Sequence, residues 1–343
     1  MRVKTGSKQS NLFDILDHAD SMTERKSGLD RLEVIDWEAF RPVLLKHLEY
    51  KAQSKGGRIP WCPVLMLKVL VLQRFFGLSD EQSEFQILDR FSFLRFLGLR
   101  PGDGAPDHAT IWSFKERLGV EGMRAIFAAF DAQLRGQNLI GKEGKIVDAS
   151  FVEAPRQRNR RHENEQIKRG ERPEHFDRKP RRGCQKDTDA RWTKKNNLAH
   201  YGYKNHAKVD AASKFVEDFA VTNAAVHDSQ ALPTLIGEED SGSALWADSA
   251  YAGKPIAEHL ERHNVLNFVC EKATATRPLK REQKRLNRRK SKVRARVEHA
   301  FGRMAQFGGN TFRRIGLRRA RFEITLTNLT YNLDRFAILH RTA

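Results

Sequence analysis

The sequence predicts a protein of mixed α and β structure, in which a helical N-terminal third precedes an α/β domain. The chain has 343 residues, which corresponds to roughly two domains, and 39% of them are hydrophobic, enough for a substantial core. The first third repeats apolar residues at helical spacing. From Lys145 onward, short apolar runs of strand length alternate with helical patterns, which is typical of an α/β domain.

The composition is strongly basic. The chain has 62 lysine and arginine residues against 43 acidic ones, a formal charge of +19. This excess favours a polyanionic partner, with nucleic acid the first candidate and an anionic membrane surface the weaker one. Cys62, Cys184 and Cys270 are scattered and odd in number, which argues against a disulfide framework and for a reducing compartment. No Cys or His spacing suggests structural zinc.

Helix start and stop signals divide the first third into short helices. Pro63 suits the first turn of a helix that Gly77 would end, and Ser79 can begin the next one. Asp107 can start another helix after the Gly/Pro-rich break at residues 101–106. Short helices joined by tight turns are compatible with a helix-turn-helix DNA reader and equally with a plain helical packing domain. The expected helices include residues 36–49, 63–76, 107–117 and 121–135.

Strand patterns begin at Lys145, in a largely apolar run interrupted by the single acid Asp148. Two later runs flank the turn at residues 211–214 and indicate a hairpin. Together with intervening helices and a long final helix, the strands describe a mixed sheet. The expected strands are 145–152, 203–210, 215–222, 244–249 and 265–270, and the intervening helices are 228–235 and 255–263.

Two segments are unusually polar. Residues 155–195, within an insertion that reaches about residue 200, are rich in both signs of charge and poor in aliphatic residues, which favours a disordered or loosely ordered segment. Residues 276–296 are dense in lysine and arginine, with Glu282 as the only acid. So unbalanced a segment favours a phosphate-contacting surface over a merely solvated one.

Three acidic residues stand out by their context. Asp148 lies inside an apolar strand, Asp248 ends another strand, and Glu298 lies on a helix beside an apolar stripe. Each has a structural alternative: an ion pair for Asp148, a turn cap for Asp248, and a pair with Arg294 one helical turn earlier for Glu298. Taken together in a strongly basic α/β domain, they can converge on hard divalent cations such as Mg²⁺ or Mn²⁺. Two such ions can activate a nucleophile and stabilise the leaving oxygen at a phosphodiester.

The chain resembles a known family, the bacterial DDE transposases of the insertion-sequence-five (IS-five) family. The resemblance runs over nearly the whole chain and rests on a combination of segments. Those segments are residues 77–82, 88–99 and 106–118 for the N-terminal transposase domain, 147–155 around Asp148, 201–206 and 226–230 between the two aspartates, 247–251 around Asp248, and 294–302 around Glu298.

The resemblance implies a helical N-terminal transposase domain over residues 1–138, which would bind the DNA ends. It also implies an RNase H-like catalytic domain over 139–343 whose triad, Asp148, Asp248 and Glu298, holds two Mg²⁺ ions, with Mn²⁺ as a possible substitute. The expected activity is strand cleavage at terminal inverted repeats, followed by attack of the freed 3′-hydroxyl on target DNA. The expected partner is double-stranded DNA, bound by a homodimer.

The sequence departs from the wider superfamily's C-terminal signature at two positions, where Ser291 replaces a tyrosine and Ala305 a lysine. A DNA-contacting role at these positions is therefore in doubt, and Lys292 or Arg303 are substitutes by position. His206 and His227 lie in family-like segments but are more often core or surface histidines. The basic residues expected to contact DNA are Arg288, Arg289, Lys292, Arg294, Arg296 and Arg303.

Three alternatives stay open. A non-catalytic DNA-binding protein, such as a repressor or a decayed transposase, explains the charge but leaves the three acids as coincidence. An RNase H-like nuclease acting on RNA–DNA hybrids shares the metal chemistry but does not need the N-terminal helices. A membrane-surface protein is least favoured, because no basic amphipathic helix with a strong apolar face is evident. Residues 1–10 show no secretory signal pattern, so we expect a cytoplasmic, nucleoid-associated protein.

Overall fold

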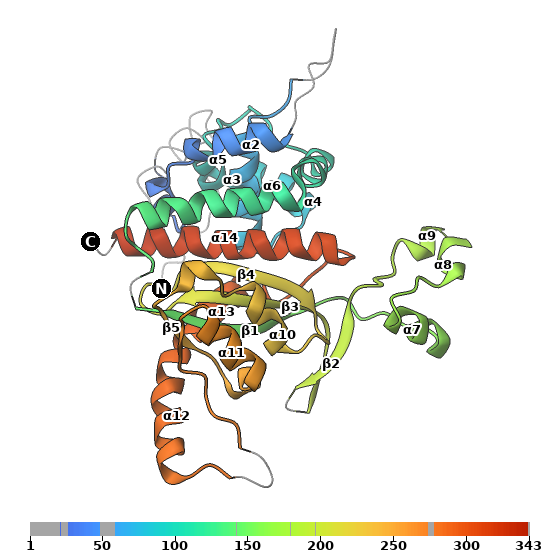
Figure 1. Ribbon diagram of the computed structural model, residues 1–343. Coiled ribbons are helices and arrows are strands. Elements are labelled where there is room, and N and C mark those ends of the chain that lie inside the picture. Colours follow the sequence, from blue (N-terminus) through green and yellow to red (C-terminus); the bar gives the residue numbers. More distant parts are fainter. Residues whose placement is uncertain are drawn as a thin grey trace, which may run out of the picture.

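The computed structural model is organised in layers around one long helix, α14 (Leu317–Arg341). Figure 1 shows the N-terminal helices on one side of α14 and the β-sheet on its other side, with further helices covering the far face of the sheet. The residues that the structure describes are 21, 27–48, 59–141, 143–178, 180–195, 197–273 and 278–341, so the expectation for residues 1–10 lies outside them.

The helical N-terminal region agrees with the sequence signals. Gly77 ends α3 in the left-handed conformation, and Ser79 caps α4 through its side chain. The helices expected at 107–117 and 121–135 form one element, α6, that is broken at Gly119, where φ is +62°. Asp107 caps α6 by accepting a 2.6 Å hydrogen bond from the Thr110 amide. The elements are the short 3₁₀ turns Asp30–Val34 and Glu38–Phe40, then α2 (Arg41–Leu48), α3 (Pro63–Phe76), α4 (Asp80–Asp89), α5 (Phe91–Leu97) and α6 (His108–Gly136).

The sheet is mixed, as predicted. Strand β1 pairs antiparallel with β3 and parallel with β5, β4 pairs antiparallel with β3, and β6 pairs parallel with β5. All five expected strands are confirmed, although the last has only two residues in the ladder, and β2 was not predicted. The strands are β1 (Lys145–Glu153), β2 (Arg191–Lys195), β3 (Leu198–Asp210), β4 (Val216–Asn223), β5 (Ala244–Trp246) and β6 (Leu266–Asn267).

The interpretation of residues 155–195 as disordered or loosely ordered is wrong for the part that the structure describes. This segment contains α7 (Arg161–Lys168), α8 (Glu174–Arg178), α9 (Pro180–Gly183) and β2, and it extends to the right of the sheet in Figure 1. Its base is fixed by the buried Asp187, which accepts hydrogen bonds from the Tyr203 hydroxyl at 2.7 Å and from the Gly316 amide at 3.1 Å. Buried polar contacts therefore take the place of the aliphatic core that the composition lacks.

The remaining helices lie in the C-terminal half of the chain. Helix α14 is buried between the sheet and α6, and it uses polar side chains at its sheet contacts: Asn328 pairs with Asn205, and Asn332 bonds both the amide and the carbonyl of Val216. The others are α10 (Asp228–Ala231), α11 (Lys254–Arg262), α12 (Arg281–Arg294) and α13 (Arg296–Gln306), with 3₁₀ turns at Leu232–Thr234, Glu238–Asp240 and Ser249–Tyr251. Among the described residues, no helix combines the length and apolar character needed to cross a membrane.

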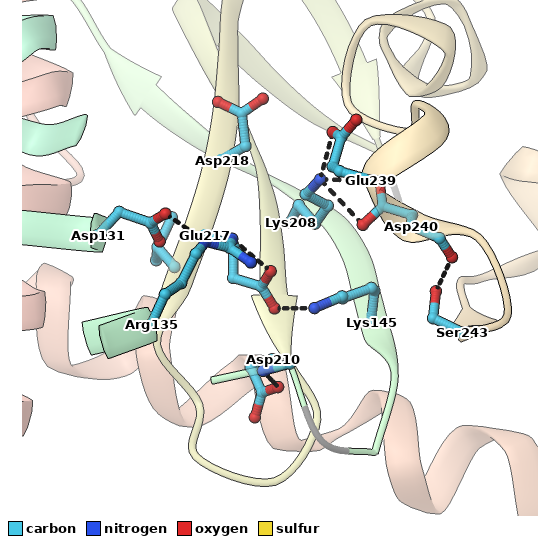
Figure 2. Close-up of polar contacts among 12 residues, drawn as sticks. Asp131, Arg135, Lys145, Lys208, Asp210, Glu217, Asp218, Glu239, Asp240 and Ser243 are labelled. Atoms are coloured by element: carbon cyan, nitrogen blue, oxygen red, sulfur yellow. Dashed lines mark hydrogen bonds and ion pairs between the residues drawn. The ribbon is translucent and has the colours of Figure 1, made fainter. Parts of the chain in front are cut away.

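Buried ion pairs join the N-terminal end of β1 to its neighbours (Figure 2). Lys145 Nζ lies 2.5 Å from Glu217 Oε1 of β4, and Arg135 of α6 reaches the same carboxylate at 3.0 Å. Nearby, Lys208 of β3 pairs with the buried Asp240 at 2.9 Å. The first two contacts join β1 and α6 to β4, and the third joins β3 to the 3₁₀ turn Glu238–Asp240.

Another buried carboxylate links α14 to the N-terminal helices and makes the fold sensitive to acid. Burial alone would raise the pKa of Glu323, but Arg74, Lys115 and Arg314 hold it at about 2. A carboxyl whose pKa is lower in the folded state stabilises the fold above its unfolded pKa and loses that contribution as the pH falls towards the folded value.

We therefore expect the free energy of unfolding to fall by about 3 kcal/mol as the pH is lowered from 4.5 to about 2, in addition to the effects of other groups. Urea unfolding at a series of pH values measures this. The Glu323→Gln variant should be less stable than the wild type at neutral pH, and its free energy of unfolding should change less as the pH is lowered through this range. A pH dependence equal to that of the wild type would contradict this role of Glu323.

Candidate active site

Asp148 lies in the middle of β1, and only 6% of its surface is exposed. Beyond Ile146 the ladder between β1 and β5 ends, while the pairing with β3 continues to Glu153. One carboxylate oxygen of Asp148 accepts the Ala149 amide at 2.8 Å. The other accepts a 2.6 Å hydrogen bond from Arg294 Nη1, so the predicted acid has a basic partner from a distant helix.

Arg294 brings Glu298 to the same place. It is the last residue of α12, and α13 begins two residues later after a break at Ala295. Its Nη1 lies 3.6 Å from Glu298 Oε1, and Glu298 itself is 61% exposed. The side chains Val297, Ala300 and Met304 of α13 are buried, which confirms the apolar stripe and leaves Glu298 on the open side of the helix. Arg294 thus contacts two of the three predicted acids.

Asp248 follows the end of β5 and caps the next turn by accepting the Ala250 amide at 2.8 Å. This is the capping role that the sequence offered as an alternative, but the carboxylate also interacts electrostatically with both Asp148 and Arg294. Strand β5 runs parallel to β1, so both aspartates lie towards the same end of the sheet. The structure therefore places the three acids around one arginine.

The charges at this site perturb one another. Burial raises the pKa of Asp148; the Ala149 amide and the Arg294 guanidinium oppose this, and the negative charge of Asp248 adds to it. Burial alone would lower the pKa of Arg294, but Asp148 and then Glu298 and Asp248 raise it overall. The acids favour a cation among them, and Arg294 provides it.

The donor set suits a hard divalent cation in its chemistry, since all three predicted ligands are carboxylates. A fourth oxygen is close by: the Tyr251 hydroxyl is buried and has no hydrogen-bond partner in the described part of the chain. Burial, followed by Asp148, Asp228 and Asp248, raises the pKa of Tyr251. In the arrangement seen here, no three His, Cys, Asp or Glu side chains of the described residues are already placed as metal ligands. Arg294 occupies the position between Asp148 and Glu298 instead.

The six basic residues expected to contact DNA fall into two groups. Arg288, Arg289 and Lys292 lie on α12, which has no buried residue and projects from the body of the protein in Figure 1; none of the three forms an ion pair with a described acid. The other three are engaged within the protein: Arg294 at the acids, Arg296 with the Ala211 carbonyl at 2.7 Å, and Arg303 with the buried Asp334 at 2.7 Å.

The remaining positions of interest are structural in their contacts. His206 is fully buried on β3 and lies 2.8 Å from the Thr222 hydroxyl, and burial lowers its pKa to about 4, so it is neutral at pH 7. His227 is exposed and caps α10 through Ser229. The Ser291 hydroxyl lies 3.7 Å from the Cys270 thiol.

The family described as "Transposase DDE domain" matches residues 140–333, more than half of the chain, and a second family, "Transposase domain (DUF772)", matches residues 18–117. The chain belongs to the DDE transposases. It is therefore an enzyme of the polynucleotidyl-transferase type, acting in DNA transposition and recombination. No solved structure matches the chain.

Two features of this candidate site were not predicted from the sequence. Tyr251 stands three residues after Asp248, but nothing in the sequence indicates that its hydroxyl is buried next to the acids. Lys195 was assigned to the polar insertion, yet its charge acts on Asp148. Both features depend on how the chain folds in space. Only the strand pattern of residues 191–195 offers a sequence signal, and it concerns the position of Lys195.

Proposed function

We propose that this transposase cuts DNA at the terminal inverted repeats of an insertion sequence and joins the freed 3′ ends to target DNA, with Asp148, Asp248 and Glu298 as the catalytic carboxylates. One observation carries the proposal: three acids that lie far apart in the chain surround a single guanidinium, that of Arg294. A phosphodiester-cleaving site that works through divalent ions needs several carboxylates that converge, and the arrangement of these acids around Arg294 supports that role.

The proposed site would hold two Mg²⁺ or Mn²⁺ ions through these carboxylates, and the ions would supply activation of the attacking oxygen and stabilisation of the leaving oxygen. Arg294 neutralises the acids until then. We expect Arg294 to release Asp148 when the acids take a cation, and a phosphate of the bound DNA would then offer the guanidinium a new anionic partner. Arg294 would thereby couple the arrival of DNA to the release of the carboxylates.

The surroundings support DNA as the partner. Arg288, Arg289 and Lys292 present unpaired positive charge on α12, which is suited to the DNA backbone and would make binding fall steeply with salt. Arg296 and Arg303 are less suited, because their side chains are already bonded within the protein. Residues 1–138 would bind the element ends and residues 139–343 would catalyse, a division that the two family matches support.

We also propose that the catalytic domain is RNase H-like and that the chain is of the IS-five kind. The strand order β4-β3-β1-β5-β6 supports the first point, since a three-stranded antiparallel unit is extended by two strands parallel to β1. A homodimer is expected, because two element ends must be brought together, and an association with the nucleoid would follow from DNA binding.

The test uses duplex DNA carrying the inverted repeats that flank the gene, with Mg²⁺ or Mn²⁺. Wild-type protein should nick this DNA and join it to a target, whereas Asp248→Asn and Glu298→Gln should bind it with nearly unchanged affinity but not cut it. Binding without cleavage by the wild type would favour the decayed transposase or repressor. Preferential cleavage of an RNA–DNA hybrid would favour an RNase H-like nuclease.

A further inference from the structure

The start of β3 does not continue straight past β1. Phe151 pairs with Lys204, and His200 precedes Lys204 by four residues. In a straight strand, His200 would therefore lie about 13 Å along β3 from Lys204, the residue opposite Phe151. Instead, the His200 ring stacks on Phe151, with ring centroids 4.1 Å apart and planes within 4°. The hairpin formed by β2 and the start of β3 is thus folded back towards β1.

Gly202 makes this bend possible. Its φ is +147°, and a Cβ there would come within 2.3 Å of the Val152 carbonyl oxygen and 2.7 Å of the Ala154 amide nitrogen. Only glycine permits such an approach of the two backbones. Figure 1 shows the result: the hairpin leaves the plane of the sheet on the side away from α14. The bend is reinforced by a 3.0 Å contact between His200 Nδ1 and Glu153 Oε1.

The fold-back carries Lys195, at the tip of the hairpin, to the catalytic strand. Its Nζ lies 5.8 Å from the centroid of the Phe151 ring, and Phe151 is three residues beyond Asp148 on β1. The Lys195 charge also acts on Asp148. A second lysine, Lys204, lies 5.4 Å from the same ring, but it is buried and pairs with Asp228 at 2.7 Å. Lys195 is exposed, and no described carboxylate lies within ion-pair distance of it.

From these contacts we infer that Lys195 is a positioning residue that holds a DNA phosphate next to the scissile one, on the strand being cut. The inference rests on the proposed function of Asp148. The Lys195 ammonium is exposed, its charge acts on Asp148, and it is free to bind an anion. The backbone of the DNA substrate supplies phosphates on both sides of the cut. Phe151 holds the lysine over its ring face and so limits where the charge can lie.

The experiment compares Lys195→Ala with Lys194→Ala in binding to the terminal-repeat duplex without metal. Lys194 is the adjacent exposed lysine of β2, and alternation along the strand directs it to the opposite face. We expect Lys195→Ala to weaken binding about tenfold at 0.1 M salt and to lower the slope of log affinity against log salt by about 1. Lys195→Arg should restore both the affinity and the salt slope of the wild type. Lys194→Ala should change the salt slope less than Lys195→Ala does.

A series of duplexes, each with one neutral methylphosphonate, then locates the contact. One substitution, within two nucleotides of the cut made by the wild type, should weaken wild-type binding but not that of Lys195→Ala. An unchanged salt slope in Lys195→Ala, or an affected phosphate elsewhere, would overturn the inference while leaving the proposed function intact. Failure of the wild type to cleave any duplex would instead overturn the proposed function, because the slope is measured without cleavage.

Discussion

Replacing Asp148 by asparagine should lower strand cleavage by a factor on the order of 10³ or more, the size of loss expected when a group central to transition-state stabilisation is removed. The change keeps the shape of the side chain and its contact with the Ala149 amide but removes the charge that Arg294 contacts at 2.6 Å. The loss should appear as slower conversion of bound DNA in single-turnover assays with Mg²⁺, and DNA affinity should stay within a few-fold of the wild type.

The matched control is Glu143→Gln, which removes a carboxylate two residues before β1. Glu143 is 62% exposed and lies 3.5 Å from Arg296, not from Arg294. It should retain near wild-type cleavage, because it alters the local charge without touching the site. The stability of Asp148→Asn should also stay close to that of the wild type, since burial already disfavours the charged carboxylate. Full cleavage by Asp148→Asn would remove the basis of the proposed site.

Glu217→Gln should produce the largest loss of stability, about 3–5 kcal/mol in the free energy of unfolding. Glu217 and Lys145 are both buried and lie 2.5 Å apart, so losing the carboxylate charge leaves the lysine without a compensating partner (Figure 2). Arg135 would be affected less, because it keeps Asp131 at 2.7 Å. Chemical denaturation of the metal-free protein, followed by circular dichroism, measures the change.

The neighbouring residue offers the comparison. Asp218→Asn removes the acid of a partly exposed pair with Arg124, for which a cost below about 1 kcal/mol is expected. The double variant Lys145→Met/Glu217→Leu should recover much of the stability lost in Glu217→Gln, because a buried pair replaced by apolar side chains leaves no lone charge. Equal destabilisation by Glu217→Gln and Asp218→Asn would show that burial of this pair has no special energetic role.

Local signals were enough for most of the secondary structure. Caps and breakers at Gly77, Ser79 and Asp107 act through neighbouring backbone groups, so the helix boundaries that depend on them were predicted correctly. The insertion was not, because its order comes from Asp187 bonding Tyr203 and Gly316, contacts that composition does not record. The short strand β2 was missed for the same reason, since it exists by pairing with a bent β3.

The sequence by itself determined the basic charge, the helical and strand segments, the family, and which three acids to examine. These depend on residue type and on short-range periodicity, both of which are written along the chain. The tertiary structure alone decided that Arg294 lies among those acids, that the Tyr251 hydroxyl is buried beside them, and that the bend at Gly202 brings Lys195 to Phe151 of β1. The physical reason is that such contacts join residues far apart in the chain, and their geometry is fixed by packing and strand curvature.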